Sequence, residues 1–249
     1  LRQIKIFHDM DSVVLANTLD PQDQKFCINY NRFIKCLSLE RYNSEDCAID
    51  KVFHLGESHC LSFAHKLVDI GGVSHQIVPK ICFGVKAYHL AQENANKYKV
   101  TLKNHLGSIP KRSIVFLSVG EIDCRTSTGI LVALQKSDAS LETLIEKTVV
   151  GYLNWVKSTN EAFAHSVKIF NVPAPVFRSG ISGDMNHKRA EVIKLFNKRL
   201  GQHAKINNQE IIDVYKMTKN DEYFSNLLFH VDNYHLGSRA LPHIAAQCN

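Results

Sequence analysis

The most informative part of the sequence is V-F-H-L-G-E-S-H-C, residues 52–60. A mostly apolar run leads into Gly56, and Ser58 follows just before a segment with helical periodicity. This order predicts a strand, a tight turn and a helix, with Ser58 at the carboxyl edge of a sheet, where α/β proteins bind ligands. Backbone N–H groups that open a helix there would face developing negative charge. A Gly-x-Ser after a strand is also a common helix cap, so the motif needs support from the rest of the chain.

From residue 51 onward, short apolar runs alternate with longer stretches of helical period. This alternation is typical of βα units that build a mostly parallel sheet. The predicted strands are residues 52–55, 76–78, 113–119, 166–172 and 210–214. The predicted helices are 61–68, 87–98, 141–157 and 188–206, the last capped by Asp184 or Asn186, with 233–246 helical in part. We therefore expect an α/β fold, a three-layer α/β/α sandwich.

Residues 1–50 have a different pattern and are expected to form an N-terminal extension of uncertain structure, ahead of one domain over residues 51–249. Residues 1–7 could form a strand, and 26–39 fit either a helix or a strand. The extension could be a lid, an added edge or the tail of an upstream module. The chain has no internal repeat and no linker-like stretch, which favours a single compact domain.

The composition narrows the class of protein. Of the 249 residues, 45% are hydrophobic and 22% are charged, and no apolar run is long enough to predict a membrane span. The net charge of +6 is spread along the chain, which favours a solvated basic surface over nucleic-acid binding and leaves an anionic substrate or partner open. Seven cysteines at irregular spacing favour a reducing, cytoplasmic location, although a chain that begins with Leu leaves a removed leader open. Zinc-site spacing is absent despite 13 histidines, so no metal is expected.

A second motif, H-V-D-N-Y-H-L-G, lies at residues 230–237. Its Asp232 and His235 are three residues apart, a spacing that puts both side chains on one face of a helical turn. The carboxylate could then accept from one imidazole nitrogen while the other nitrogen faces a nucleophile. Alone, such a pair is more often a surface cap with an incidental histidine.

Taken together, the two motifs resemble the first and last conserved blocks of the SGNH hydrolases, often called the GDSL family. Gly56-Glu57-Ser58 corresponds to the family's Gly-Asp-Ser, with Glu in place of Asp, and Asp232 with His235 corresponds to its Asp-x-x-His. The resemblance covers residues 51 to about 245. It implies a flavodoxin-like fold and a catalytic triad of Ser58, His235 and Asp232, with no metal or organic cofactor.

The resemblance also implies an oxyanion hole. Gly84 in I-C-F-G-V-K is the best match for the second block, so the Ser58 and Gly84 N–H groups would bind the oxyanion. The stretch F-L-S-V-G-E-I-D-C-R, residues 116–125, resembles the third block, Gly-x-Asn-Asp, but has Ile122 where the donor Asn belongs. Loss of one donor typically lowers turnover about 10²–10³-fold.

Arg125 and His59 are candidate replacements for the missing oxyanion donor, because both lie near the expected site in the sequence. Arg125 could instead bind an anionic group of the substrate. It could also simply pair with Glu121 or Asp123, and the sequence leaves these alternatives open.

The expected function is that of a serine-dependent acyl ester hydrolase, an esterase or deacetylase, with an acylated carbohydrate as the first substrate class to test. One alternative is an O-acyltransferase of the same fold. The other is a catalytically weak SGNH-like domain that binds a glycan or a protein, which Ile122 and Glu57 favour. The expected partner is a small-molecule or glycan ester; the sequence predicts no oligomeric state.

Overall fold

The computed structural model describes residues 28, 31–35 and 50–248. Its centre is a six-stranded sheet with the strand order β2-β3-β1-β4-β5-β6. The strands are β1 (Asp50–Gly56), β2 (Leu67–Ile70), β3 (Val73–Ile81), β4 (Ile114–Ser118), β5 (Ser166–Phe170) and β6 (Glu210–Ile212). All neighbouring strands pair in parallel except β2, which is antiparallel to β3. The predicted mostly parallel sheet is confirmed.

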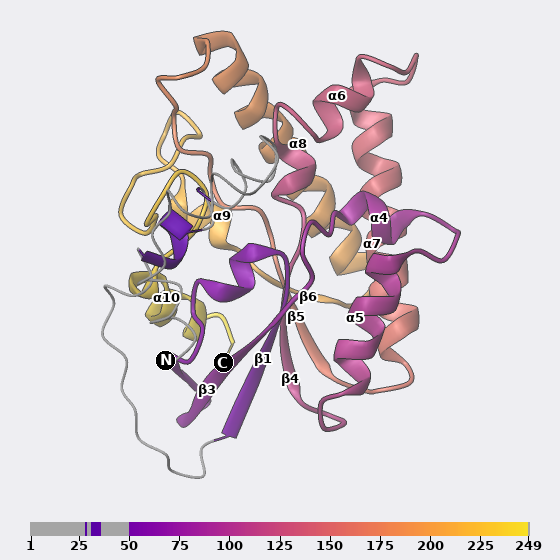
Figure 1. Cartoon of the computed structure of the whole chain (residues 1–249), viewed down its shortest axis with the longest axis vertical. Coiled ribbons are helices and arrows are strands. Elements are labelled where there is room, and N and C mark those ends of the chain that lie inside the picture. The colour runs from indigo at the N-terminus through magenta and orange to yellow at the C-terminus, as the bar shows by residue number, and fades with distance from the viewer. Residues whose placement is uncertain (1–27, 29–30, 36–49, 249) are drawn as a thin grey trace.

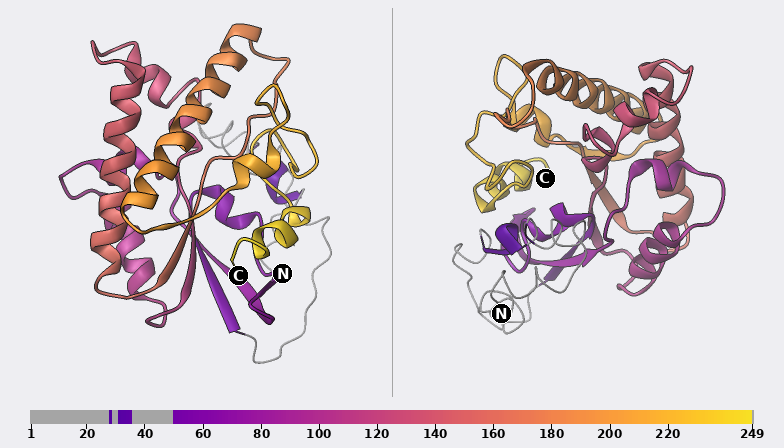
Figure 2. Two further views of the ribbon diagram at one scale, coloured as in Figure 1. Left: turned by 180° about the vertical axis from the view of Figure 1, so that it is seen from behind. Right: turned by 45° about the horizontal axis from the view of Figure 1, so that its top comes forward.

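Helices cover both faces of this sheet (Figure 1). Between residues 50 and 248, the α-helices are α4 (Ala87–Ala91), α5 (Lys97–Gly107), α6 (Ile130–Leu134), α7 (Leu141–Asn160), α8 (Gly183–Ile206), α9 (Val214–Thr218) and α10 (Leu241–Ala245). The 3₁₀ helices of the same range are η1 (Ser58–Leu61), η2 (Ile122–Cys124) and η3 (Ser238–Ala240). The helices α4, α5, α7 and α8 pack on one face, and η1 and α10 pack on the other. Figure 2 shows from behind that α7 and α8 lie side by side.

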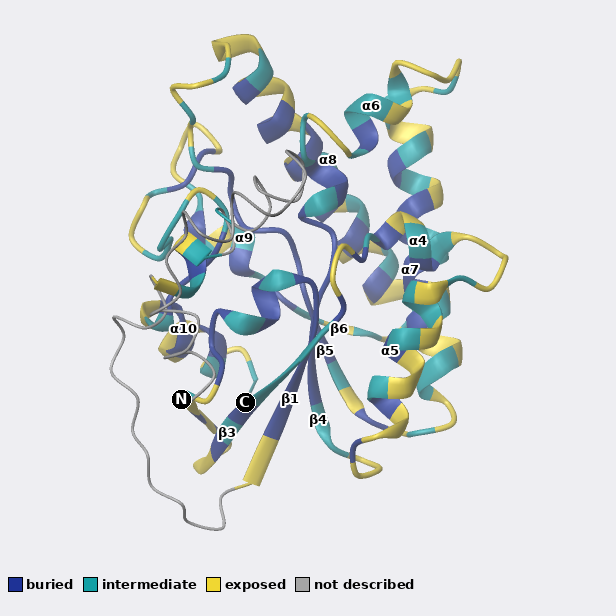
Figure 3. Cartoon of the chain, viewed as in Figure 1, coloured by how far each residue is buried: buried dark blue, intermediate teal, exposed yellow. Residues whose placement is uncertain are grey.

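The core explains why these segments form a sandwich. Successive strand residues point to opposite faces of a sheet, so Val115 and Leu117 join the hydrophobic cluster under α7 and α8, whereas Phe116 between them joins the cluster under α10. The largest side chains of the first cluster include Tyr152 and Phe196, both fully buried. Burial on both faces is visible as the dark strands at the centre of Figure 3.

The helix predicted over residues 61–68 is wrong. η1 ends at Leu61, His65 has a positive φ of 61°, and β2 begins at Leu67. The two glycines Gly71 and Gly72, with φ of 61° and 78°, turn the chain back into β3. A Gly-Gly pair between two β-rich runs is a hairpin signal, and the helical spacing upstream of it conceals that signal.

Two other helix boundaries differ from the prediction. The segment 87–98 splits into α4 and α5, because the Asn96 side chain caps α5 by accepting from the N–H groups of Tyr98 and Lys99. Helix α8 begins at Gly183, and its cap is Ser182 rather than Asp184 or Asn186. The serine hydroxyl accepts from the Met185 N–H.

Of the N-terminal region, only residues 28 and 31–35 are described, and 31–35 are helical. The strand predicted over 1–7 lies outside the described residues, as does most of 26–39. The division at residue 50 therefore stays a prediction. Within the described residues, none of the helices combines the length and apolar character that crossing a membrane requires.

Candidate active site

Three segments far apart in the sequence meet at the carboxyl edge of the sheet: the turn after β1, the turn after β4, and the segment 230–237. Gly56 makes the first turn possible. Its φ is 140°, and a Cβ there would lie 2.0 Å from the Ser118 carbonyl oxygen of β4. Only glycine fits so close an approach, and the chain then enters η1 with Ser58 as its first residue.

Ser58, His235 and Asp232 form a continuous hydrogen-bonded chain. The Ser58 Oγ lies 2.8 Å from His235 Nε2, and His235 Nδ1 lies 2.7 Å from Asp232 Oδ2. The other carboxylate oxygen, Oδ1, accepts from the backbone N–H groups of Tyr234 and His235 at 2.7 and 2.6 Å. The aspartate side chain thus holds its own loop in shape, so the predicted pairing forms on a carboxylate-bound turn rather than on a helix.

The environment fixes the charges of this pair. Burial would raise the pKa of Asp232, but hydrogen bonds from His235 outweigh it and lower the pKa to about 2. Burial lowers the pKa of His235 despite the neighbouring carboxylate. A neutral imidazole that donates from Nδ1 to Asp232 leaves Nε2 free to accept from the Ser58 hydroxyl, the arrangement a general base requires.

Phe33 contributes to the site in a way the sequence does not indicate. Its ring stacks on the His235 imidazole, with 3.7 Å between ring centroids and 16° between planes. It is only 1% exposed. The segment around Phe33 carries no motif, and only the tertiary structure places it against residues two hundred positions away.

Ser58 opens into a cavity of about 290 Å³. The residues that line it are Arg32, Phe33, Ser58, Phe83, Gly84, Ile122, Arg125, Asp232, Asn233, Tyr234 and His235. Gly84, the predicted second oxyanion donor, is among them. Within the described part of the chain, the backbone N–H groups of Ser58 and Gly84 donate to no acceptor. Ile122 lines the same cavity, and its side chain has no hydrogen-bond donor.

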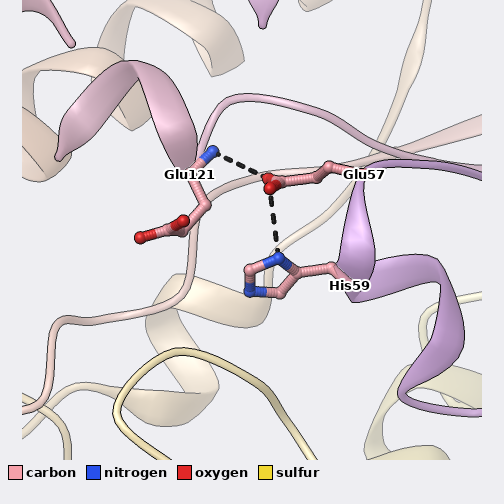
Figure 4. A group of neighbouring side chains, drawn as sticks. All are labelled: Glu57, His59 and Glu121. Carbon is pink, nitrogen blue, oxygen red and sulfur yellow. Dashed lines mark hydrogen bonds and ion pairs between the residues drawn. The ribbon is translucent and has the colours of Figure 1, made fainter. Parts of the chain in front are cut away.

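His59 lies behind the triad, with both ring nitrogens facing acceptors. Its Nε2 is 2.9 Å from the Tyr234 carbonyl oxygen, and its Nδ1 is 3.5 Å from Glu57 Oε1 (Figure 4). The same Glu57 oxygen accepts from the Glu121 N–H at 3.2 Å. Both ring nitrogens thus face these acceptors, and His59 is not among the described residues that line the cavity of Ser58, so the structure gives it a different place from the one the sequence suggested.

These buried groups form a charge network. Burial lowers the pKa of His59, but the charge and hydrogen bond of Glu57 outweigh it and raise the pKa to about 8. Burial raises the pKa of Glu121, yet Arg125 and Arg189 outweigh it and lower the pKa to about 2. His59 is consequently an imidazolium at neutral pH and links the turn after β1 to the loop of Asp232.

Glu57, His59 and Glu121 also have the residue types of a metal site, since their ligand atoms lie within 4.8 Å of one another. Both carboxylate oxygens of Glu121 are already engaged, however. Figure 4 shows the Glu121 carboxylate pointing away from Glu57, and that carboxylate contacts Arg125 at 2.5 Å and Arg189 at 3.3 Å. Two guanidiniums beside a carboxylate repel a divalent cation, so the cluster fits an ion-pair network and not a metal.

Arg125 forms one of the pairings that the sequence left open, the one with Glu121. Its Nε and Nη2 both bind Glu121 Oε2, at 2.6 and 2.5 Å, and it lines the cavity of Ser58. Its guanidinium lies 4.8 Å from the Tyr234 ring centroid. Asp123 takes no part in this pairing, because its carboxylate accepts from the N–H groups of Ala87 and Tyr88 at the start of α4.

Comparisons with known proteins bear on the fold. No model of a protein family matches the sequence, and no curated protein matches it. Solved structures do match. An extracellular lipase from Streptomyces rimosus has 13% identity and a TM-score of 0.50, over 80% of this chain and 99% of the lipase. A GDSL-like lipase from Bacteroides thetaiotaomicron VPI-5482 has 13% identity and a TM-score of 0.51, over 88% and 94% of the two chains. The chain therefore has the fold of the GDSL-like lipases, as its motifs predicted.

Proposed function

We propose that this protein is a serine-dependent acyl ester hydrolase. The observation that carries the proposal is the chain Ser58–His235–Asp232, with contacts of 2.8 and 2.7 Å, opening into a cavity. The fold it shares with GDSL-like lipases supports the same chemistry. The fold would not be sufficient evidence without these contacts, since one fold hosts many functions.

In the proposed mechanism, the Ser58 Oγ attacks the ester carbonyl carbon and passes its proton to His235 Nε2, while Asp232 stabilises the imidazolium. In this proposal the N–H groups of Ser58 and Gly84, which donate to no acceptor among the described residues, stabilise the resulting oxyanion. The bond to the alcohol oxygen then breaks, and His235 returns the proton to that oxygen. Water, activated by His235, attacks the acyl-serine and releases the acid and Ser58.

The substrate we propose to test first is an acetylated carbohydrate. A cavity of about 290 Å³ suits a short acyl group with part of an alcohol. If a sugar hydroxyl replaced water in the second step, the protein would be an O-acyltransferase, the alternative within the same chemistry. Incubation of an acetyl donor with free sugar distinguishes the two, because only transfer yields a newly acetylated sugar.

The first experiment is labelling with a fluorophosphonate probe, followed by mass mapping. The unmodified protein should be labelled at Ser58, and Ser58→Ala and His235→Ala should abolish labelling. Ser127→Ala, an exposed serine in the turn after η2, is the matched control and should label normally. Well-folded protein that resists the probe, or label at another serine, would contradict the proposal.

Ile122 favours a second candidate, a catalytically weak domain that binds a glycan or a protein. It lines the cavity where a third oxyanion donor would be expected, and it has no polar atom in its side chain. The test is Ile122→Asn. A gain in turnover of about tenfold or more would indicate an impaired hole in a weak enzyme. An unchanged or lower rate would mean that the two N–H groups, with other charges nearby, already suffice.

A further inference from the structure

The cavity of Ser58 is lined by more positive than negative charge. Arg32 and Arg125 bring two guanidiniums to its wall. Among the described lining residues the sole carboxylate is Asp232, and both of its oxygens are engaged by its own loop and by His235. Nothing in the described wall is therefore free to neutralise either arginine.

Arg125 is held in a fixed orientation. Two of its nitrogens bind Glu121, and its guanidinium lies against the Tyr234 ring. The third nitrogen, Nη1, has no acceptor among the described residues, and 30% of the side chain is exposed. A guanidinium fixed on one edge and open on the other binds a further anion at little entropic cost.

Glu121 does not cancel the positive charge around this arginine. The same carboxylate also faces Arg189, a buried residue whose Nε and Nη1 have no hydrogen-bond partner. Arg178 approaches the other part of Tyr234, donating to its hydroxyl at 2.6 Å, and pairs with no carboxylate in the described part of the chain. Three guanidiniums thus surround one tyrosine ring beside the reactive serine.

We infer that the substrate of this site is an anionic ester, one whose carboxylate or similar group is bound by Arg125 and Arg32 while Ser58 attacks the ester carbonyl. The inference rests on the proposed function and specifies its substrate class. A planar carboxylate matches the open edge of a guanidinium. The apolar body of the substrate would contact Phe33, Phe83 and Ile122 of the same wall.

The test uses ester pairs that differ only in charge. 4-Acetoxybenzoate and 4-acetoxybenzamide place the charge in the alcohol part, and the 4-nitrophenyl esters of adipic acid and of its monoamide place it in the acyl part. We expect kcat/KM to favour the anion at least about tenfold in one pair at low salt, after correction for the hydroxide-catalysed rates. The preference should shrink as NaCl rises, because salt screens exposed charges.

Two variants test whether the arginines cause the preference for the anionic ester. Arg32→Gln, at an exposed position, should reduce the ratio of anionic to neutral kcat/KM several-fold, and Arg125→Gln should bring it close to one. Arg112→Gln removes the same charge from an exposed loop before β4 and should leave the ratio unchanged. An unchanged ratio in Arg32→Gln and Arg125→Gln, with both variants folded, would overturn the assignment.

Binding to Ser58→Ala separates this inference from the proposed function. This variant should bind the anionic ester of a pair several-fold more tightly than the neutral one, as measured by calorimetry. If the unmodified protein hydrolyses both members of each pair equally, the function stands and the inference fails. If it hydrolyses none but Ser58→Ala prefers the anion, the function fails and the anion site stands. Equal binding of both members would overturn the inference in either case.

Discussion

Two histidine–carboxylate pairs lie side by side in this molecule, with 4.7 Å between the ring centroids of His235 and His59. The pair His235–Asp232 reaches the cavity, and the pair His59–Glu57 is buried behind it. Their pKa values move in opposite directions: burial lowers that of His235, whereas Glu57 and Glu121 outweigh burial and raise that of His59 to about 8.

The difference shows that the partners of the second ring nitrogen decide the role of a histidine. His59 has acceptors at both nitrogens, Glu57 and the Tyr234 carbonyl, so the doubly protonated ring is favoured. Burial of His235 favours the neutral ring first, and the ring meets only a hydroxyl at Nε2 and has the cation His59 at its side. One pair is thus arranged for proton transfer and the other for holding loops together.

The largest effect should follow from removing His235, the histidine of the pair that reaches the cavity. We predict that His235→Ala lowers kcat/KM about 10⁴–10⁶-fold, because the serine loses its base. The free energy of unfolding should change far less than the activity. Steady-state assays on an ester that the unmodified protein hydrolyses, with urea melts of both proteins, check this. A decrease in kcat/KM of less than tenfold would mean that His235 is not the general base, and that the two pairs do not differ in their role in catalysis.

The next largest effect concerns the buried pair. His59→Phe leaves Glu57 without its charged partner inside the protein, and breaking a buried pair costs about 3–5 kcal/mol. His59→Gln keeps a donor for one of the two acceptors and should cost clearly less. Urea denaturation at pH 7 measures both. Equal stability of His59→Phe and the unmodified protein would show that the network contributes nothing to folding.

The buried imidazolium also predicts a pH dependence. Because the pKa of His59 is raised from 6.5 to about 8 on folding, its stabilising contribution is fully present below pH 6.5 and is lost as pH rises through 8. The rise of about 1.5 units corresponds to about 2 kcal/mol. The free energy of unfolding of the unmodified protein relative to His59→Gln should shrink by that amount between pH 6 and pH 9. A constant difference would mean that the pKa of His59 is the same in the folded and the unfolded protein, and a difference that grows with pH would mean that burial keeps the ring neutral.

The smallest effect is on the acid limb of catalysis. Because the pKa of His235 is lowered, we predict that this histidine stays in its base form, and that kcat/KM is maintained, at pH values below the usual histidine range. His59→Gln should move the acid limb of the profile to higher pH, because it removes a neighbouring cation. A pH–rate profile of both proteins checks the direction. A limb that moves to lower pH would show that the two pairs are not electrostatically linked as the geometry implies.

Local patterns were sufficient for much of the fold. The apolar runs of β1, β4 and β5 and the long periodic helices α7 and α8 stand out in the sequence, because burial on both faces of a parallel sheet leaves continuous hydrophobic runs. The sequence analysis did not predict the edge strand β2. Only every second residue of this strand is buried, and its pairing with β3 depends on a two-glycine turn. Helices α5 and α8 begin where a side chain caps the first turn, and hydrophobic periodicity does not indicate such a cap.

For the site, local motifs were enough to predict residues at the carboxyl edge of the sheet, namely Gly56, Ser58, Gly84, Asp232 and His235. Which of their neighbours contact one another depends on how distant segments of the chain pack. Phe33 on His235, His59 on Glu57 and Tyr234, and three arginines around one ring are contacts between segments far apart in the chain. Their charges depend on burial and on partners across space, and neither quantity is encoded in a local pattern.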